Sequence, residues 1–251
     1  MSHPWKNIAL NDYENHMRLE NVYQLQTMNE MMKEQFCAYP AQSVMILGVA
    51  GGNGLEHIDQ KIFRSVYGVD INPDYLDVCQ KRHSVLEDCF KPICADLSDD
   101  ALQLPRADLL IANLLIEYIG YECFQTVVRK VKPQYISCII QVGTETSFVS
   151  ESPYLHAFDR LHEVHHPIGE QELVSRMQEI GYTKELTAVK DLPKGKKLVR
   201  LDFAGYRHTD YTERYLQSRQ PGLYVRVVFL NVPSRSGSAE AAPISGCSTR
   251  S

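Results

Sequence analysis

One short stretch decides the fold, Val44-Met45-Ile46-Leu47-Gly48-Val49-Ala50-Gly51-Gly52-Asn53-Gly54. Its first half is an unbroken apolar run, which is typical of a parallel strand buried on both faces. Its second half is rich in glycine, and a helical stretch is expected next, from Ile58 to Phe63. Such a turn lets a ligand lie against the main chain at a helix N-terminus, where free N–H groups point outward. The stretch therefore indicates a site for a nucleotide-like ligand.

Strands and helices alternate along the rest of the chain. Further strands are expected at residues 65–71, 92–95, 107–112, 135–142, 183–191 and 196–204, and helices at 11–37, 74–86, 120–131 and 169–180. This alternation predicts an α/β fold with a doubly wound, mostly parallel sheet of seven strands. The turn signal Leu192-Pro193-Lys194-Gly195 joins the last two strands, which should form an antiparallel C-terminal hairpin at one edge.

Two carboxylates mark the ends of the second and third strands. Asp70 can accept hydrogen bonds from two ribose hydroxyls, and Asp96 can accept one from the exocyclic amine of a base. In open α/β sheets, ligands bind at these carboxyl ends of strands. The alternative is that each acid caps the helix that follows it. The dinucleotide pattern G-x-G-x-x-G fits poorly, because Ala50 stands at its second glycine.

Composition restricts the class of protein. The chain has 251 residues, 44% of them hydrophobic and 23% charged, with a formal net charge of −5. These values exclude a collagen-like chain, a disordered chain and a disulfide scaffold, and the mild acidity argues against an extended nucleic-acid surface. The seven cysteines form no C-x-x-C pair, and no apolar run approaches the roughly 20 residues of a membrane span. We expect a soluble, cytoplasmic protein with reduced thiols and no membrane partner.

Five segments together resemble the motifs of class I S-adenosyl-L-methionine (SAM) dependent methyltransferases, which have a Rossmann-like fold. The segments are Val44–Gly54, Val66-Tyr67-Gly68-Val69-Asp70-Ile71-Asn72-Pro73, Cys94-Ala95-Asp96-Leu97, Ala107-Asp108-Leu109-Leu110-Ile111-Ala112-Asn113-Leu114-Leu115 and Val131-Lys132-Pro133. The resemblance covers roughly residues 5–205. Two positions depart from the usual pattern, because Ile46 stands where many members have an acid and Ala50 where glycine is usual.

The resemblance implies SAM as the cofactor and assigns its binding residues. The loop residues Gly48, Ala50, Gly52, Asn53 and Gly54 would contact the methionyl part, Asp70 with Ile71 would hold the ribose, and Asp96 with Leu97 the adenine. Asn113, at the end of the fourth strand, would face the methionine moiety or the substrate.

The catalytic residues are less constrained, because methyl transfer from a sulfonium needs mainly positioning and a base only if the acceptor loses a proton. The candidates are His16, Glu117, Tyr118 and His156. His16 could instead belong to a capped helix start, and Glu117 and Tyr118 could simply begin the next helix. The spacing of His162, His165 and His166 suggests a metal, but no Cys or carboxylate pattern completes it, so no metal is expected.

The expected organisation is a helical lid at residues 1–42, a SAM-binding domain at 43–206, an extension at 207–232 that could add a strand, and a disordered tail at 233–251. The function that follows is methyl transfer to a small molecule, since no separate recognition domain or basic face is visible. A non-catalytic SAM-binding module and an NAD-linked oxidoreductase are the alternatives. The sequence leaves the acceptor and the oligomeric state open.

Overall fold

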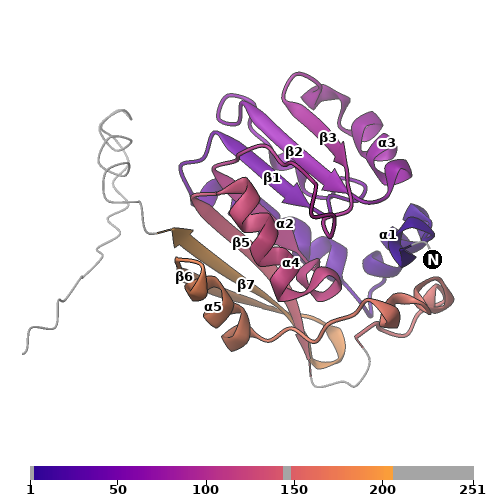
Figure 1. The fold of residues 1–251 in the computed structure, drawn as a ribbon. Helices are drawn as coiled ribbons and strands as arrows, with labels where there is room; N and C mark the ends of the chain where they lie inside the picture. The colour runs from indigo at the N-terminus through magenta and orange to yellow at the C-terminus, as the bar shows by residue number, and fades with distance from the viewer. Residues whose placement is uncertain (1–2, 144–147, 206–251) are drawn as a thin grey trace, which may run out of the picture.

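The structure is a computed structural model that describes residues 3–143 and 148–205. Within these residues one seven-stranded sheet has the order β3-β2-β1-β4-β5-β7-β6 (Figure 1). The strands are β1 (Ser43–Leu47), β2 (Ser65–Asp70), β3 (Phe90–Cys94), β4 (Leu109–Asn113), β5 (Tyr135–Gly143), β6 (Tyr182–Asp191) and β7 (Lys196–Gly205). The α-helices are α1 (Leu10–Arg18), α2 (Gln24–Ala38), α3 (Pro73–Arg82), α4 (Ile116–Val131) and α5 (Glu170–Glu179). No helix in the described part is long and apolar enough to cross a membrane.

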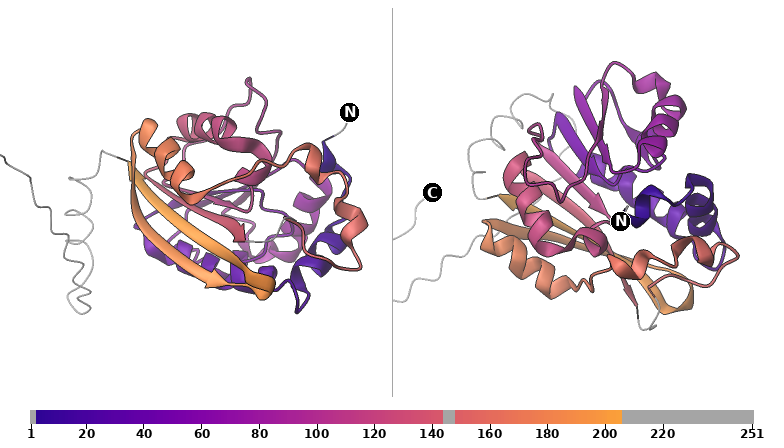
Figure 2. Two further views of the ribbon diagram at one scale, coloured as in Figure 1. Left: turned by 90° about the horizontal axis from the view of Figure 1, so that it is seen from below. Right: turned by 45° about the vertical axis from the view of Figure 1, so that its right-hand side comes forward.

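Helices cover both faces of the sheet, because its central strands are apolar on both faces. In β1, Val44 and Ile46 belong to the apolar cluster under α2 and α3, while Met45 and Leu47 belong to the cluster under α4 and α5. Successive side chains of a strand point to opposite faces, which explains this alternation. Figure 2 shows the sheet lying between the two helical layers.

The strand order reverses at β1, which pairs in parallel with β2 on one side and with β4 on the other. In open α/β sheets, ligands bind outside the carboxyl ends of the strands at such a switch point. Here β1 runs into the glycine-rich loop, β2 ends at Asp70 and β4 ends at Asn113. The fold therefore brings three of the predicted ligand-binding elements to one edge of the sheet.

The C-terminal hairpin is antiparallel, as predicted. β7 lies between β5 and β6 and pairs antiparallel with both. The four pairings among β1 to β5 are all parallel, so the predicted doubly wound sheet is confirmed. The extension expected at 207–232 and the tail expected at 233–251 lie outside the described residues.

The helix expected at residues 58–63 was predicted wrongly. A single 3-10 turn, η2 (Leu55–His57), follows the glycine-rich loop, and turns connect it to β2. Gly54 stands before η2 with a left-handed φ of 88°, and residues 58–64 continue as turns and irregular backbone. The face of the sheet beside the loop is covered instead by α2, through Met28, Met31 and Met32.

The helix expected at residues 11–37 is two helices, α1 and α2. The backbone turns at Tyr23, which has a left-handed φ of 54° and donates its amide to the Leu19 carbonyl. The Asn21 side chain in this turn donates to the Glu151 carbonyl at 3.1 Å. The break lets α1 leave the sheet and lie beyond the strand ends, where Figure 1 shows it.

A buried polar cluster joins β7 to β5 and α2. Arg200 is 2% exposed and Asp202 is fully buried, and two nitrogens of the guanidinium donate to the two carboxylate oxygens at 2.9 and 2.5 Å. Ser137 of β5 and Tyr39 also donate to this carboxylate. Every acceptor oxygen of the pair is therefore satisfied inside the protein, as burial of charge requires.

Candidate functional site

The glycine-rich loop is fixed to the end of β2. Four of its residues have positive φ: Gly48 at 67°, Ala50 at 47°, Gly52 at 86° and Gly54 at 88°. The Gly48 amide donates to the Val69 carbonyl at 2.8 Å, and the Ala50 amide donates to the Asp70 carboxylate at 2.9 Å. The loop backbone thus lies directly against the acid that was predicted to hold a ribose.

Ala50→Gly is expected to stabilise the protein. A left-handed conformation costs a residue with a Cβ about 1–2 kcal/mol, and glycine avoids that cost but loses more entropy on folding. The net gain in the free energy of unfolding should be about 1 kcal/mol, measured by urea denaturation. The control is Ala112→Gly in buried β4, which should destabilise. A lower stability of Ala50→Gly than of the wild type would contradict the strain at Ala50.

The first cavity, which we call the loop cavity, opens beyond the ends of β1, β2 and β4. It brings together these predicted cofactor-binding residues: Gly48, Ala50, Asp70, Ile71, Asp96, Leu97 and Asn113. Asn53 lines a small cavity beside the loop, to which Gly48 and Ala50 also contribute. Gly52 and Gly54 line none of these cavities; a Cβ at Gly52 would lie 2.7 Å from His83, and one at Gly54 would lie 2.8 Å from Met32.

Asp70 is held as an acceptor at the wall of the loop cavity. It is 8% exposed, and its two oxygens accept the amides of Ala50 and Asn72 at 2.9 Å each. Burial raises the pKa of Asp70, and these amide donors oppose the rise. The cap of α3 is Asn72, whose side chain accepts the Asp74 amide. Asp70 is therefore not the helix cap.

Asp96 lies two residues beyond β3 and accepts hydrogen bonds from both the amide and the hydroxyl of Ser98, at 3.0 and 2.6 Å. Burial would raise the pKa of Asp96, but the Ser98 hydrogen bonds and the nearby His3 bring it below its ordinary value. The carboxylate is thus ionised at neutral pH and still has acceptor capacity toward a ligand.

The side chain of Asn113 is fixed by hydrogen bonds to α2. Its amide group exchanges two hydrogen bonds with the amide of Gln35, at 3.0 and 2.9 Å. Gln35 also donates to Ser137, which belongs to the Arg200–Asp202 cluster. Both polar atoms of Asn113 are thus paired with α2, and the residue contributes a fixed wall to the loop cavity.

The N-terminal segment covers the loop cavity. This segment consists of η1 (Pro4–Lys6), α1 and the residues between them, and three polar links join it to α3 and its N-cap. The side chain of Asn72 donates to the Trp5 carbonyl at 3.0 Å, and the hydroxyl of Tyr75 donates to the Ile8 carbonyl at 2.9 Å. Arg82 forms a bidentate ion pair with Glu14 of α1. His3, Trp5 and Tyr13 of the N-terminal segment line the cavity.

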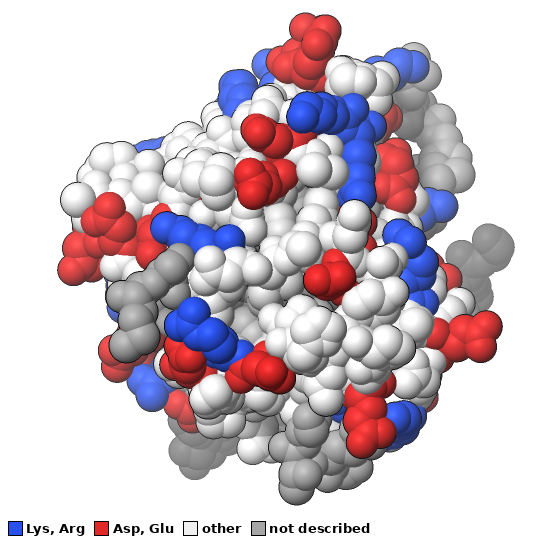
Figure 3. Space-filling model, turned by 90° about the vertical axis from the view of Figure 1, so that its right-hand side faces the viewer, with Lys and Arg blue, Asp and Glu red and all other residues white. Residues whose placement is uncertain are grey.

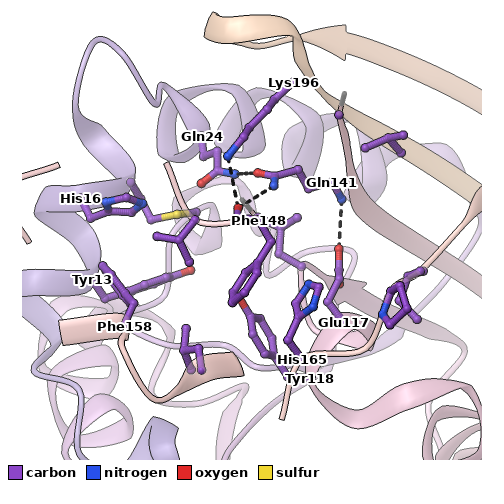
Figure 4. A pocket seen from close by; sticks show the side chains of 18 of the residues that line it. Tyr13, His16, Gln24, Glu117, Tyr118, Gln141, Phe148, Phe158, His165 and Lys196 are labelled. Carbon is purple, nitrogen blue, oxygen red and sulfur yellow. Dashed lines mark hydrogen bonds between the residues drawn. The ribbon is translucent and has the colours of Figure 1, made fainter. Parts of the chain in front are cut away.

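A second cavity of about 400 Å³, which we call the aromatic cavity, adjoins the first. Its lining includes the rings of Trp5, Tyr13, Tyr118, Phe148, Phe158 and His165. Four residues line both cavities: Trp5, Tyr13, Leu114 and Tyr118. Figure 4 shows rings around the cavity, with Glu117, Gln141 and Lys196 as polar groups on its walls. The two cavities therefore meet across one thin wall.

Glu117 is a buried acid at the wall of the aromatic cavity. It is 7% exposed, and one carboxylate oxygen accepts a hydrogen bond from the backbone amide of Gln141 at 3.0 Å (Figure 4). The other oxygen, Oε2, is buried without a hydrogen-bond partner among the described residues. Burial raises the pKa of Glu117 to about 7, although the Gln141 amide opposes this rise.

A kink in α4 places Glu117 and Tyr118. Gly120 has φ 74° and ψ 169°, so the first turn of the helix is set at an angle to the rest. The ring of His166 lies 3.6 Å from the position that a Cβ at Gly120 would occupy. The backbone amide of His166 donates to the Glu117 carbonyl at 2.7 Å. The sequence predicted that α4 begins at Gly120, whereas it begins one turn earlier with the two candidate residues.

Of the two histidine candidates, the structure brings His16 to the aromatic cavity and leaves His156 outside. His16 is 4% exposed, and its Nδ1 lies 2.7 Å from the Ser152 hydroxyl. Burial, and then the charge of Lys196, lower the pKa of His16 to about 4, so the ring is neutral at pH 7. His156 is exposed on the short turn η4 (Leu155–Phe158), whose apolar Phe158 takes the buried side.

Several lining residues were not found from the sequence. Trp5 could have been singled out because it is the only tryptophan of the chain. Phe148 and Phe158 belong to no recognisable sequence pattern. Lys196 and Arg200 lie among charged residues near the hairpin turn, a setting typical of solvated side chains, but both are buried. Lys196 is 3% exposed and donates to Ser150 Oγ at 2.9 Å. Among the described residues no group of three or more His, Cys, Asp or Glu side chains is arranged to hold a metal.

Comparisons with known proteins support the fold. No protein-family model matches the chain, and no curated protein is similar to it in sequence. Solved structures do match it. Magnesium protoporphyrin IX methyltransferase from Synechocystis PCC 6803, with bound SAM, is 13% identical, covers 80% of this chain and 89% of its own, and gives a TM-score of 0.54.

A second match is the N-methyltransferase NodS from Bradyrhizobium japonicum WM9 in complex with S-adenosylhomocysteine (SAH). It is 11% identical, covers 78% of this chain and 99% of its own, and gives a TM-score of 0.55. In both cases the similarity extends over the sheet and its helices and not over a single motif. The chain has the fold of the class I SAM-dependent methyltransferases.

Proposed function

We propose that this protein is an enzyme that transfers the methyl group of SAM to a small molecule held in the aromatic cavity. The observation that carries the proposal is the meeting of the two cavities across Trp5, Tyr13, Leu114 and Tyr118. The loop cavity is lined by acidic side chains and by loop residues with left-handed backbone conformations. The aromatic cavity is large enough for a small molecule. In-line transfer requires such an arrangement, with donor and acceptor on either side of the reacting carbon.

The residues of the loop cavity fit SAM. The Asp70 carboxylate uses one lone pair of each oxygen for an amide, which leaves acceptor capacity for ribose hydroxyls. Asp96 lies in the same cavity and can accept from an adenine amine. The indole nitrogen of Trp5 is a buried donor without a partner among the described residues, and it can serve a ligand acceptor. When bound, SAM supplies an activated methyl group on a good leaving group.

A small acceptor agrees with the surface. The face shown in Figure 3 carries acidic and basic side chains interspersed around a largely uncharged centre. Nucleic-acid binding depends on basic side chains that neutralise several phosphates together. The mixed charge on this face, together with a cavity lined by aromatic rings, favours a small molecule over a nucleic acid.

The alternatives have less support. Dinucleotide-binding sheets place the pyrophosphate at a helix N-terminus, whereas the loop here leads into the single turn η2. A non-catalytic SAM-binding module would not need a second cavity that adjoins the first.

The proposal is tested with the full chain by calorimetric titration with SAM, SAH and NAD. We expect binding of SAM and SAH at micromolar concentrations and no binding of NAD. Binding of NAD alone would overturn the proposal. Formation of SAH from SAM, followed by mass spectrometry over a panel of small acceptors, then distinguishes an enzyme from a binding module.

The N-terminal segment acts as a lid in this proposal, and Arg82→Gln tests it. The variant loses the bidentate pair with Glu14, which links α1 to α3. Because hydrogen bonds to charged groups contribute about 1.5–3 kcal/mol and this pair is partly exposed, we expect about tenfold weaker SAH binding. Amide hydrogen exchange should increase in α1 and not in β1. The control is Lys81→Gln on the exposed side of α3; equal affinity of the two variants would contradict the lid.

A further inference from the structure

The unpaired oxygen of Glu117 needs a partner from outside the described chain. A buried carboxylate oxygen without a hydrogen bond is costly, and such groups in native proteins call for an explanation. Glu117 is more than nine-tenths buried, and it lines the aromatic cavity. A molecule in the cavity that carries a hydrogen-bond donor would supply the partner that this oxygen lacks among the described residues.

The walls of the aromatic cavity are flat rings from separate elements. The rings of Trp5 and Tyr118 meet edge to face with centroids 5.0 Å apart, and those of Phe148 and His165 stack at 3.9 Å. Phe158 and Tyr13 add two further rings. Aromatic pairs prefer stacked or edge-to-face arrangements, so these walls favour a flat aromatic guest. A volume of about 400 Å³ lies within the range of small-molecule sites.

We propose that the methyl acceptor is a hydroxyaryl compound whose hydroxyl group donates its hydrogen bond to Glu117 Oε2, and that Glu117 takes the hydroxyl proton during transfer. This inference rests on the proposed function. The hydroxyl oxygen forms a bond to the methyl carbon, the carbon–sulfur bond breaks, and its electron pair stays on sulfur. The products are an aryl methyl ether, SAH and a protonated Glu117. The acceptor ring lies among the aromatic side chains, next to the wall shared with the loop cavity.

Titratable groups from several elements surround Glu117. On its own helix Tyr118 and Tyr121 are near, Cys138 lies on β5, His165 and His166 lie on the segment after β5, and Lys196 lines the same cavity from β7. Burial, opposed by the Gln141 amide, sets the pKa of Glu117 at about 7. Since the ionised form is the proton acceptor, methyl transfer should rise with pH through about 7.

The variant E117Q reverses the polarity of the site. The Gln141 N–H requires an oxygen, so the new amide would place its oxygen there and its NH₂ group toward the cavity. A donor then stands where an acceptor stood. The variant should prefer a ligand that has an ether oxygen to one that has a hydroxyl group.

The test uses the full chain saturated with SAH and three probes: 2-naphthol, 2-methoxynaphthalene and decahydro-2-naphthol. Wild-type protein should bind 2-naphthol at least about tenfold more tightly than 2-methoxynaphthalene, since a hydrogen bond to a charged group contributes about 1.5–3 kcal/mol. It should also bind 2-naphthol more tightly than decahydro-2-naphthol, because contacts between aromatic rings contribute about 0.5–1.5 kcal/mol each. E117Q should lose or reverse the preference for the hydroxyl group and keep its affinity for SAH. The control is E122Q, an exposed substitution on α4 that should retain the preference.

A second readout is independent of any acceptor. Because the pKa of Glu117 is raised in the folded state, wild-type stability should fall as pH rises from about 4.5 to about 7. E117Q should lack that part of the fall. If E117Q does not fold, Glu117→Asp, which retracts the carboxylate by one methylene, should weaken the preference for 2-naphthol.

Each contrary outcome points to a different error. Failure of wild-type protein to bind SAH would overturn the proposed function. Normal SAH binding with no preference for 2-naphthol over its methyl ether, or with no binding of any probe, would overturn the acceptor class alone. Equal binding of decahydro-2-naphthol would remove the requirement for an aromatic ring. An unchanged preference in E117Q or Glu117→Asp would exclude Glu117 as the recognising group.

Discussion

Asp70→Ala is expected to weaken SAM binding by at least about 100-fold. Its carboxylate offers acceptors to two ribose hydroxyls, and each hydrogen bond to a charged group contributes about 1.5–3 kcal/mol. The substitution also removes the acceptor of the Ala50 amide, one of the links between the loop and the end of β2; the Gly48 amide keeps its hydrogen bond to the Val69 carbonyl. The affinity is measured by calorimetric titration with SAM and with SAH, which should weaken in parallel.

The matched control is Asp77→Ala, which removes an exposed carboxylate from α3 without touching either cavity. Its affinity for SAM should equal that of the wild type. Circular dichroism of both variants checks that the sheet is intact. A loss of less than about threefold in Asp70→Ala would show that another group holds the ribose, and would contradict the assignment.

Asp202→Ala is expected to lower the free energy of unfolding by about 3–5 kcal/mol, the usual cost of removing one partner of a buried ion pair. The Arg200 guanidinium, which is 2% exposed in the wild type, would lose both hydrogen bonds to the carboxylate and keep its ion pair with the half-exposed Glu34 at 3.5 Å. The hydroxyls of Tyr39 and Ser137 would lose an acceptor as well. Since whole domains are stable by only about 5–15 kcal/mol, urea denaturation should show the loss clearly.

The same hairpin supplies the control. Asp191 pairs with Lys197 at 3.5 Å, but its side chain is 84% exposed, and surface pairs contribute about 0–1 kcal/mol. Asp191→Ala should therefore be almost neutral. The double variant Arg200→Met with Asp202→Leu should recover most of the stability, because apolar residues often replace a buried pair without loss. Equal small effects of both alanine variants would show that the buried pair is not a determinant of stability.

Local patterns were enough to predict most of the sheet. The apolar run of β1 is continuous because both of its faces are covered, and the turn before Lys196 marks the hairpin. The helix after the loop could not be excluded in this way. The face of the sheet that such a helix would cover is covered by α2, which precedes β1 in the chain. Packing by a segment from elsewhere in the chain leaves no signal in residues 58–63.

The same contrast applies to the site. Asp70 and Asp96 follow apolar strands, so their position at a sheet edge could be inferred. The aromatic cavity could not, because Trp5, Tyr118 and Phe148 come from distant segments and each looks ordinary within its own. Lys196 looked solvated because its neighbours are charged; pairing of β7 with the far end of β5 buries it, at a register opposite Gly143. The roles of all these residues stay predictions.

The shared wall has a kinetic consequence. Trp5 and Tyr13 belong to the N-terminal segment, and they close the loop cavity and shape the aromatic cavity at the same time. A movement of this segment that admits SAM to the loop cavity would also remove a wall from the aromatic cavity. Turnover should therefore follow an ordered sequence, in which SAM binds before the acceptor and the methylated product leaves before SAH.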